Sequence, residues 1–60
     1  MRITSWKVAL KLARCAGEDA ANRRMRRAGR KIWTADDYTF AARTMSCILE
    51  QLGYGDRIAA

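Results

Sequence analysis

The stretch from residue 33 to residue 54, WTADDYTFAARTMSCILEQLGY, decides the fold because it carries a helix start, an apolar stripe and a helix stop. Thr34 is placed to be the N-cap, where its hydroxyl accepts a hydrogen bond from a backbone N–H without a partner inside the helix. Asp37 stands at the third helical position, where a capping box has an acid. Gly53 can adopt the left-handed conformation that ends a helix. We therefore predict a helix that begins after Thr34 and stops at Gly53.

Apolar side chains in this segment recur at spacings of three and four residues, which is the period of an amphipathic helix. They are Tyr38, Ala41, Ala42, Met45, Ile48, Leu49 and Leu52. Trp33 and Tyr38 stand at the two positions of a hydrophobic staple, and Tyr54 stands where a Schellman motif places a contact with Leu49. Trp33 and Tyr38 also suit a binding hot spot, because aromatic residues with arginine neighbours are common there.

On the N-terminal side of this segment, the residue pattern of the first half of the chain predicts a second long helix, from about Thr4 to Ala28. Thr4 or Ser5 can cap its start, and Gly29 can end it. Gly17 costs about 1 kcal/mol relative to alanine inside a helix, so a kink or break there is an alternative to one continuous helix. The apolar stripe is narrow and made mostly of small side chains, which let two helix axes approach closely: Trp6, Ala9, Leu10, Ala13, Ala16, Gly17 and Ala20.

The connector between these helices, residues 29–33, is short, and short connections join antiparallel neighbours. We predict an all-α fold, an antiparallel helical hairpin that forms a single domain over residues 1–60. With the turn near residue 31, Ala13 lies level with Leu49. Trp6 then lies near the C-terminal tail, where Tyr54 and Ile58 can cover it.

A chain of 60 residues buries only a small core, and such chains usually need a disulfide, a metal or a second chain. There is no histidine, and Cys15 and Cys47 are the only cysteines, so one chain cannot form a closed zinc site. The two thiols can form a disulfide or a redox switch, or they are two small buried or half-buried apolar side chains. An isolated hairpin leaves several apolar residues off the seam in water: Val8, Leu12, Cys15, Phe40 and Cys47. We therefore predict a homodimer in which two hairpins form a four-helix bundle.

The net charge of +6 is unevenly placed, because residues 1–31 carry ten basic side chains and only two acidic ones. The strongest local signal is RRMRRAGRK, residues 23–31. Arginine forks bind phosphates and carboxylates, so this segment suits a nucleic acid or an acidic protein surface. A charged tip also stabilises the helix dipole and keeps a small protein soluble, which is a third interpretation. The predicted partner-binding residues are Arg23, Arg24, Arg26, Arg27, Arg30, Lys31, Trp33 and Phe40.

The sequence offers few candidate catalytic residues, because it lacks histidine, a glycine-rich phosphate loop and metal-ligand spacing. Asp36 and Asp37 are adjacent, but neighbouring helix positions point about 100° apart, so we interpret them as cap acids. We expect no enzyme activity, no cofactor and no metal. No stretch is apolar enough to span a membrane, and residues 6–14 predict a core-facing helix with a basic outer face rather than a membrane-surface helix. We expect a cytoplasmic protein.

The stretch from Glu18 to Tyr54 resembles small uncharacterised proteins encoded by bacteriophages and prophages. The residues that carry the resemblance are Glu18–Arg26, Gly29 with Arg30, Trp33, Asp36–Tyr38, and Leu52–Tyr54. The resemblance implies a phage or mobile-element accessory protein in the host cytoplasm that binds and inhibits a host protein or nucleoprotein complex, such as a defence system. It implies no site residue. Two alternatives are a small basic protein that grips nucleic-acid phosphates, and an assembly subunit whose helices complete a larger bundle.

Overall fold

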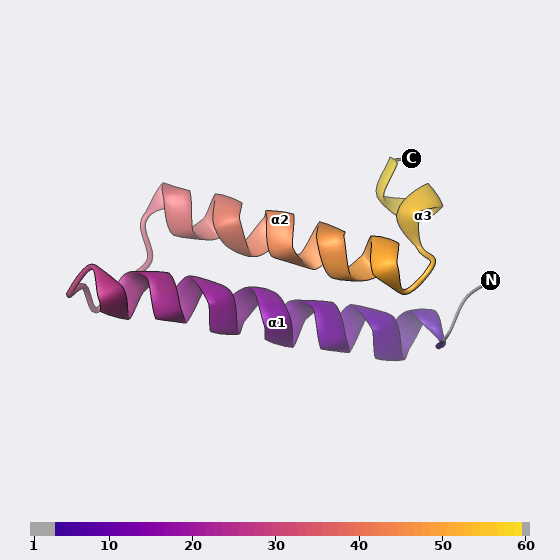
Figure 1. Ribbon diagram of the computed structural model, residues 1–60, viewed down its shortest axis with the longest axis horizontal. Coiled ribbons are helices and arrows are strands. Elements are labelled where there is room, and N and C mark those ends of the chain that lie inside the picture. Colours follow the sequence, from indigo (N-terminus) through magenta and orange to yellow (C-terminus); the bar gives the residue numbers. More distant parts are fainter. Residues whose placement is uncertain (1–3, 60) are drawn as a thin grey trace.

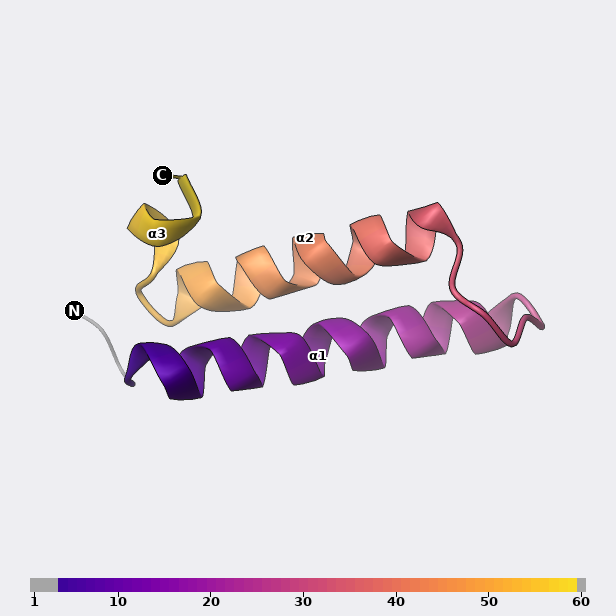
Figure 2. The ribbon, with the colours of Figure 1, turned by 180° about the vertical axis from the view of Figure 1, so that it is seen from behind.

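The computed structural model describes residues 4–59, which form two long antiparallel helices followed by a short third helix (Figure 1). Helix α1 spans Trp6–Arg27, α2 spans Ala35–Gln51, and α3 spans Gly55–Ala59. In both views of the ribbon, α2 runs along α1, and α3 lies at the end where α1 begins (Figure 2). The predicted all-helical hairpin is confirmed. None of the helices in this described part is long and apolar enough to cross a membrane.

Both ends of α1 follow from local sequence. The N-cap is Ser5, whose hydroxyl accepts a hydrogen bond from the backbone N–H of Val8 at 3.4 Å. Gly29 follows the helix with a φ of 73°, a left-handed conformation that suits glycine. This turn lets the N–H of Arg30 donate to the carbonyl oxygen of Met25 at 3.0 Å, which is the long bond of a Schellman motif. The predicted stop at Gly29 is confirmed.

Gly17 lies inside α1, and the helix runs through it without a break. Its role is close packing: a Cβ atom added there would lie 2.8 Å from the carbonyl oxygen of Ala41 and 2.8 Å from Cγ of Met45. Glycine is used where one backbone must approach another this closely. The alternative of two separate helices is therefore not what the chain adopts.

Helix α2 begins and ends where its sequence predicts. Thr34 is the N-cap, and Gly53 has a φ of 92° after the last turn. The N–H of Tyr54 donates to the carbonyl oxygen of Leu49 at 2.8 Å. The Tyr54 ring also packs in one cluster with the Leu49 side chain, which is the hydrophobic contact of a Schellman motif.

The core between α1 and α2 is thin because small side chains form most of it. Ala13 and Leu49 share one cluster, as their predicted register requires. Such small side chains bring the helices close together but bury little apolar area, and area sets the hydrophobic stabilisation. The buried hydrophobic residues are Ala9, Ala13, Ala21, Ala41, Leu49 and Tyr54.

The C-terminal tail is fastened to the start of α1. The Tyr54 hydroxyl donates to the carbonyl oxygen of Thr4 at 2.6 Å. The centroids of the Tyr54 and Trp6 rings lie 5.2 Å apart, which confirms that Tyr54 covers Trp6. The guanidinium carbon of Arg57 lies 4.6 Å from the Trp6 ring centroid, within cation–π distance. The side chain of Ile58 lies outside the described residues.

The face of α2 that packs on α1 differs from the prediction near its start. Tyr38 is 63% exposed and Ala42 is exposed, so their assignment to the seam was wrong. Asp37 is fully buried instead. Asp37, Ala41 and Met45 are spaced by four residues and share one helix face. The face of α2 that packs on α1 therefore includes the buried Asp37.

Both thiols and several large apolar side chains face water. Cys15 and Cys47 are free and exposed, so they are neither joined by a disulfide nor buried or half-buried in this hairpin. Their exposure matches their predicted place off the seam of an isolated hairpin. Val8 is 48% exposed, Leu12 is 50% exposed and Phe40 is 40% exposed, as expected for a hairpin that stands alone.

Candidate partner-binding surface at the hairpin turn

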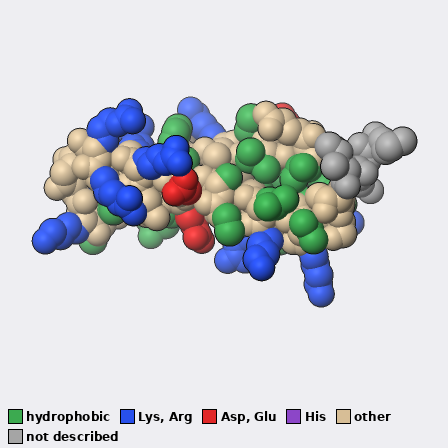
Figure 3. Space-filling view, turned by 60° about the horizontal axis from the view of Figure 1, so that its bottom comes forward, with side chains coloured by type: hydrophobic (Ala, Val, Ile, Leu, Met, Phe, Trp, Pro, Cys, Tyr) green, Lys and Arg blue, Asp and Glu red, His purple; other side chains and the backbone are tan. Residues whose placement is uncertain are grey.

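The last turn of α1, the connector and the first turns of α2 meet at one end of the hairpin. On the face drawn in Figure 3, Lys and Arg side chains gather at this end, and hydrophobic side chains gather on the half nearer the termini. We call the basic end the turn-end surface. It includes every residue predicted to bind a partner: Arg23, Arg24, Arg26, Arg27, Arg30, Lys31, Trp33 and Phe40.

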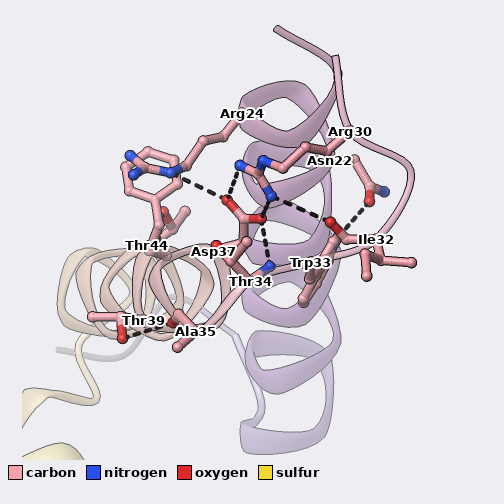
Figure 4. Close-up of polar contacts among 11 residues, drawn as sticks. Asn22, Arg24, Arg30, Ile32, Trp33, Thr34, Ala35, Asp37, Thr39 and Thr44 are labelled. Atoms are coloured by element: carbon pink, nitrogen blue, oxygen red, sulfur yellow. Dashed lines mark hydrogen bonds and ion pairs between the residues drawn. The ribbon is translucent and has the colours of Figure 1, made fainter. Parts of the chain in front are cut away.

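Asp37 lies beneath this surface and holds two of its arginines (Figure 4). The Nε of Arg24 donates to Asp37 Oδ1 at 3.1 Å, and Nη2 of Arg30 donates to the same oxygen at 3.2 Å. Nη1 of Arg30 donates to Asp37 Oδ2. The backbone N–H of Thr34 donates to Oδ2 at 2.8 Å, as the capping box predicts. Asp37 thus joins the end of α1, the connector and the start of α2.

These contacts keep Asp37 ionised although its side chain is buried. The hydrogen bond from Arg30 is the largest cause that lowers the pKa of Asp37 well below its usual range. The backbone N–H of Thr34 lowers this pKa further, while burial opposes both. The same hydrogen bond raises the pKa of Arg30. Arg24 and Arg30 therefore stabilise the turn before any partner arrives, and part of their charge is already compensated.

The remaining cationic side chains of the turn-end surface differ in whether they form an ion pair. Arg23 pairs with Asp19 at 2.9 Å, but both side chains are largely exposed, so this pair contributes little stability. Arg26, Arg27 and Lys31 are exposed and form no ion pair with any residue between positions 4 and 59. These three side chains carry the charge that is available to a partner.

The aromatic residues at this end are held by contacts of their own. Nε1 of Trp33 donates to Oδ1 of Asn22 at 2.9 Å. The Trp33 and Tyr38 rings meet nearly edge to face, with centroids 5.0 Å apart and an interplanar angle of 70°. This contact matches the predicted hydrophobic staple. Tyr38 still leaves most of its surface in water, so it can also contact a partner.

A shallow groove of about 460 Å³ lies between the end of α1 and the second turn of α2. Three arginines and three apolar residues line this groove, and the guanidinium carbon of Arg24 lies 5.7 Å from the Phe40 ring centroid. Such a lining suits a ligand group with an apolar body and a negative charge. The lining residues are Ala20, Arg23, Arg24, Arg27, Ala28 and Phe40.

The buried role of Asp37 is the feature that the sequence interpretation missed, because Asp37 was assigned only to the helix cap. Its spacing of four residues from Ala41 was a signal that it belongs to the seam. The stacking of Arg57 on Trp6 was also missed. The five-residue α3 that carries Arg57 is too short to produce an apolar period.

Within residues 4–59, no group of three His, Cys, Asp or Glu side chains is arranged to hold a metal ion. Comparisons of the chain with protein families, with curated proteins and with solved structures found no match. The chemistry of the turn-end surface is therefore the basis for a functional proposal.

Proposed function

We propose that this chain is a non-enzymatic accessory protein of a phage or mobile element that binds a host protein or nucleoprotein complex and inhibits it. A defence system is one such target. The supporting observation is that Arg26, Arg27 and Lys31 are exposed and have no ion-pair partner within the described chain, while Ile32 beside them is 76% exposed. A surface of this kind acts by occluding an acidic site on its partner.

Apolar side chains among the cations favour a protein partner over a phosphate backbone. Ile32, Tyr38 and Phe40 all expose a large fraction of their surface at this end. Binding to phosphates gains nothing from an exposed isoleucine, because that interaction is electrostatic. In a protein interface, apolar and aromatic side chains are buried at the centre, and arginines are enriched beside them.

A second candidate function is nucleic-acid binding, and the same unpaired cations support it. Arg26, Arg27 and Lys31 lie at the C-terminal end of α1 and in the connector, where phosphate oxygens can approach. The short α3 lies at the opposite end of the hairpin, so it does not supply the third helix of a helix-turn-helix domain. Such binding would read phosphates, not base sequence, and would weaken steeply with salt.

Affinity capture from a bacterial host lysate, followed by mass spectrometry, tests the first proposal. The decisive variant replaces Arg26, Arg27 and Lys31 by Gln. A matched control replaces Lys7, Arg14 and Arg43 by Gln, which removes the same charge from exposed positions elsewhere. We expect the same partner to bind the wild type and the control but not the first variant. Equal binding by all three proteins contradicts the proposal.

A salt titration separates the two candidate functions. If the chain grips phosphates, its affinity for short DNA or RNA duplexes falls linearly on a logarithmic salt scale. Losing Arg26, Arg27 and Lys31 would then reduce the slope by about 3, at roughly 0.9 per phosphate contact. If no duplex binds at low salt, nucleic-acid binding is excluded.

We also propose that two hairpins pair to form a four-helix bundle. The alanine-rich core and the exposed Val8 and Leu12 side chains support this proposal. Two packed hairpins would cover such residues, as bundles do. Light scattering should give twice the chain mass of 6.8 kDa, and a stable monomer at high concentration contradicts the proposal.

A further inference from the structure

The distribution of apolar and charged side chains on α1 points to how two hairpins meet. We infer that α1 packs antiparallel against α1 of a second copy, across a face that carries Val8, Leu12 and Cys15. This inference rests on the proposed dimer and specifies its interface. It places the two turn-end surfaces at opposite ends of the assembly.

The proposed contact face has the spacing of a helix–helix seam. Val8, Leu12 and Cys15 follow one another at intervals of four and three residues, and all three are exposed. That alternation is the spacing of the a and d positions of a coiled-coil seam. The next position along the seam is Asp19, which lies level with Val8 of the second copy when Leu12 packs against Cys15, so the apolar contact is confined to the layers of Leu12 and Cys15. Figure 3 shows hydrophobic side chains gathered on the half of the molecule nearer the termini.

The charges beside the seam are self-complementary in the antiparallel orientation. The first half of α1 is basic. The only acidic side chains of α1, Glu18 and Asp19, follow Cys15. If Leu12 of one chain packs against Cys15 of the other, each Lys11 lies beside Glu18 of the second copy. Neither side chain has an ion pair within the described residues. A parallel orientation would instead bring the two basic turn ends together, and like charges repel.

The same charges favour a second copy over other occupants of this face. An acidic protein segment or an anionic lipid surface would meet Glu18 and Asp19 at the end of the apolar stripe, where like charges disfavour contact. Only a surface that carries both signs in the reverse order matches Lys11 and Glu18 together. The chain itself has that surface.

The antiparallel arrangement has a functional consequence. A two-fold axis midway between Leu12 and Cys15 lies about 20 Å from Arg27 along the helix, at 1.5 Å per residue. The two turn-end surfaces then lie about 40 Å apart and face opposite ways. One dimer would bind two partner molecules, or two distant sites on one partner, and gain avidity from doing so.

Cysteine cross-linking tests the interface with residues that the chain already has. Cys47→Ser leaves only Cys15, and Cys15→Ser leaves only Cys47. Cys47 is two positions from both Met45 and Leu49, which face α1, so it lies on the outer side of α2. We expect a short bis-maleimide to link two chains of Cys47→Ser, and not of Cys15→Ser. If both variants are dimers by mass but only Cys15→Ser is linked, this interface is wrong and the proposed dimer stands. If both are monomers at high concentration, the dimer itself is refuted.

Charge exchange tests the orientation. Lys11→Glu or Glu18→Lys alone should weaken the dimer about tenfold, because each replaces two exposed attractions by repulsions. The double variant Lys11→Glu/Glu18→Lys should restore the wild-type dissociation constant, measured by sedimentation equilibrium. A double variant as weak as the single ones overturns the antiparallel orientation. Far-UV circular dichroism at high concentration checks that each variant keeps its helices.

Discussion

Gly17→Ala tests the helix packing by the sign of its effect on stability. In an ordinary helix interior, replacing glycine by alanine raises the free energy of unfolding by about 1 kcal/mol. Here the new Cβ would lie 2.8 Å from the carbonyl oxygen of Ala41, a backbone atom that moves only if α2 moves. The contact with Cγ of Met45, also 2.8 Å, is easier to relieve because that side chain is flexible.

The magnitude follows from comparing the two effects. Overpacking a close contact costs about 1–3 kcal/mol, which exceeds the helix-propensity gain of about 1 kcal/mol. We therefore expect Gly17→Ala to lower the free energy of unfolding by about 1 kcal/mol. For a domain of this size, that corresponds to a decrease in Tm of about 4–8 °C.

Thermal unfolding followed by far-UV circular dichroism, at one fixed protein concentration, measures this change. Gly55→Ala is the matched control, because its new Cβ would meet only Cγ of Glu50, at an ordinary 3.4 Å. We expect the control to leave Tm unchanged or slightly raised. If Gly17→Ala is more stable than the wild type, α1 and α2 are not in close contact at this point and the packing described above is wrong.

Three further predictions concern the turn and the tail. The pKa of Asp37 is lowered in the folded chain, so the unfolded chain binds more protons below about pH 4 and stability falls there. Asp37→Asn should flatten this decline in urea titrations between about pH 7 and pH 3; an equally acid-sensitive variant would contradict the role of its ion pairs. Gly29→Ala should cost about 1 kcal/mol, measured by thermal unfolding, because the φ of 73° is strained for alanine while its Cβ would meet no atom within 4 Å. Gly29→Asn, which tolerates that conformation, should lose less, and equal losses would refute the backbone explanation. Tyr54→Phe removes the hydrogen bond to Thr4 and should cost about 1 kcal/mol by urea unfolding; no loss would show that this bond is not stabilising.

The helices were predictable because their boundaries depend on local chemistry. Ser5, Gly29, Thr34 and Gly53 stand at the ends of α1 and α2, where a cap or a left-handed turn needs those residue types. The antiparallel pairing followed from the short connector, because a short chain segment cannot reach the far end of a helix. The close approach at Gly17 was consistent with a stripe of small residues. The sequence, however, did not decide between one continuous helix and a helix that is broken at Gly17.

The turn-end chemistry was harder to predict because it depends on long side chains that reach across the turn. A run of arginines indicates available charge, but it does not show which guanidinium folds back onto a buried carboxylate. Arg24 and Arg30 do so, whereas Arg26 and Arg27 in the same run remain unpaired within the described chain. The exposure of Tyr38 was also missed, because it depends on the burial of Asp37. When Asp37 faces α1, the adjacent Tyr38 points toward water.

We propose that one hairpin buries too little apolar surface to be stable without a second chain. The most direct test is the Tm of the wild type measured over a hundredfold range of protein concentration, with the mass determined at both ends. Because association stabilises only the folded state, we predict that Tm rises with concentration and that the dimer dissociates with loss of helix on dilution. A monomer that unfolds cooperatively at the same Tm throughout this range would contradict the claim.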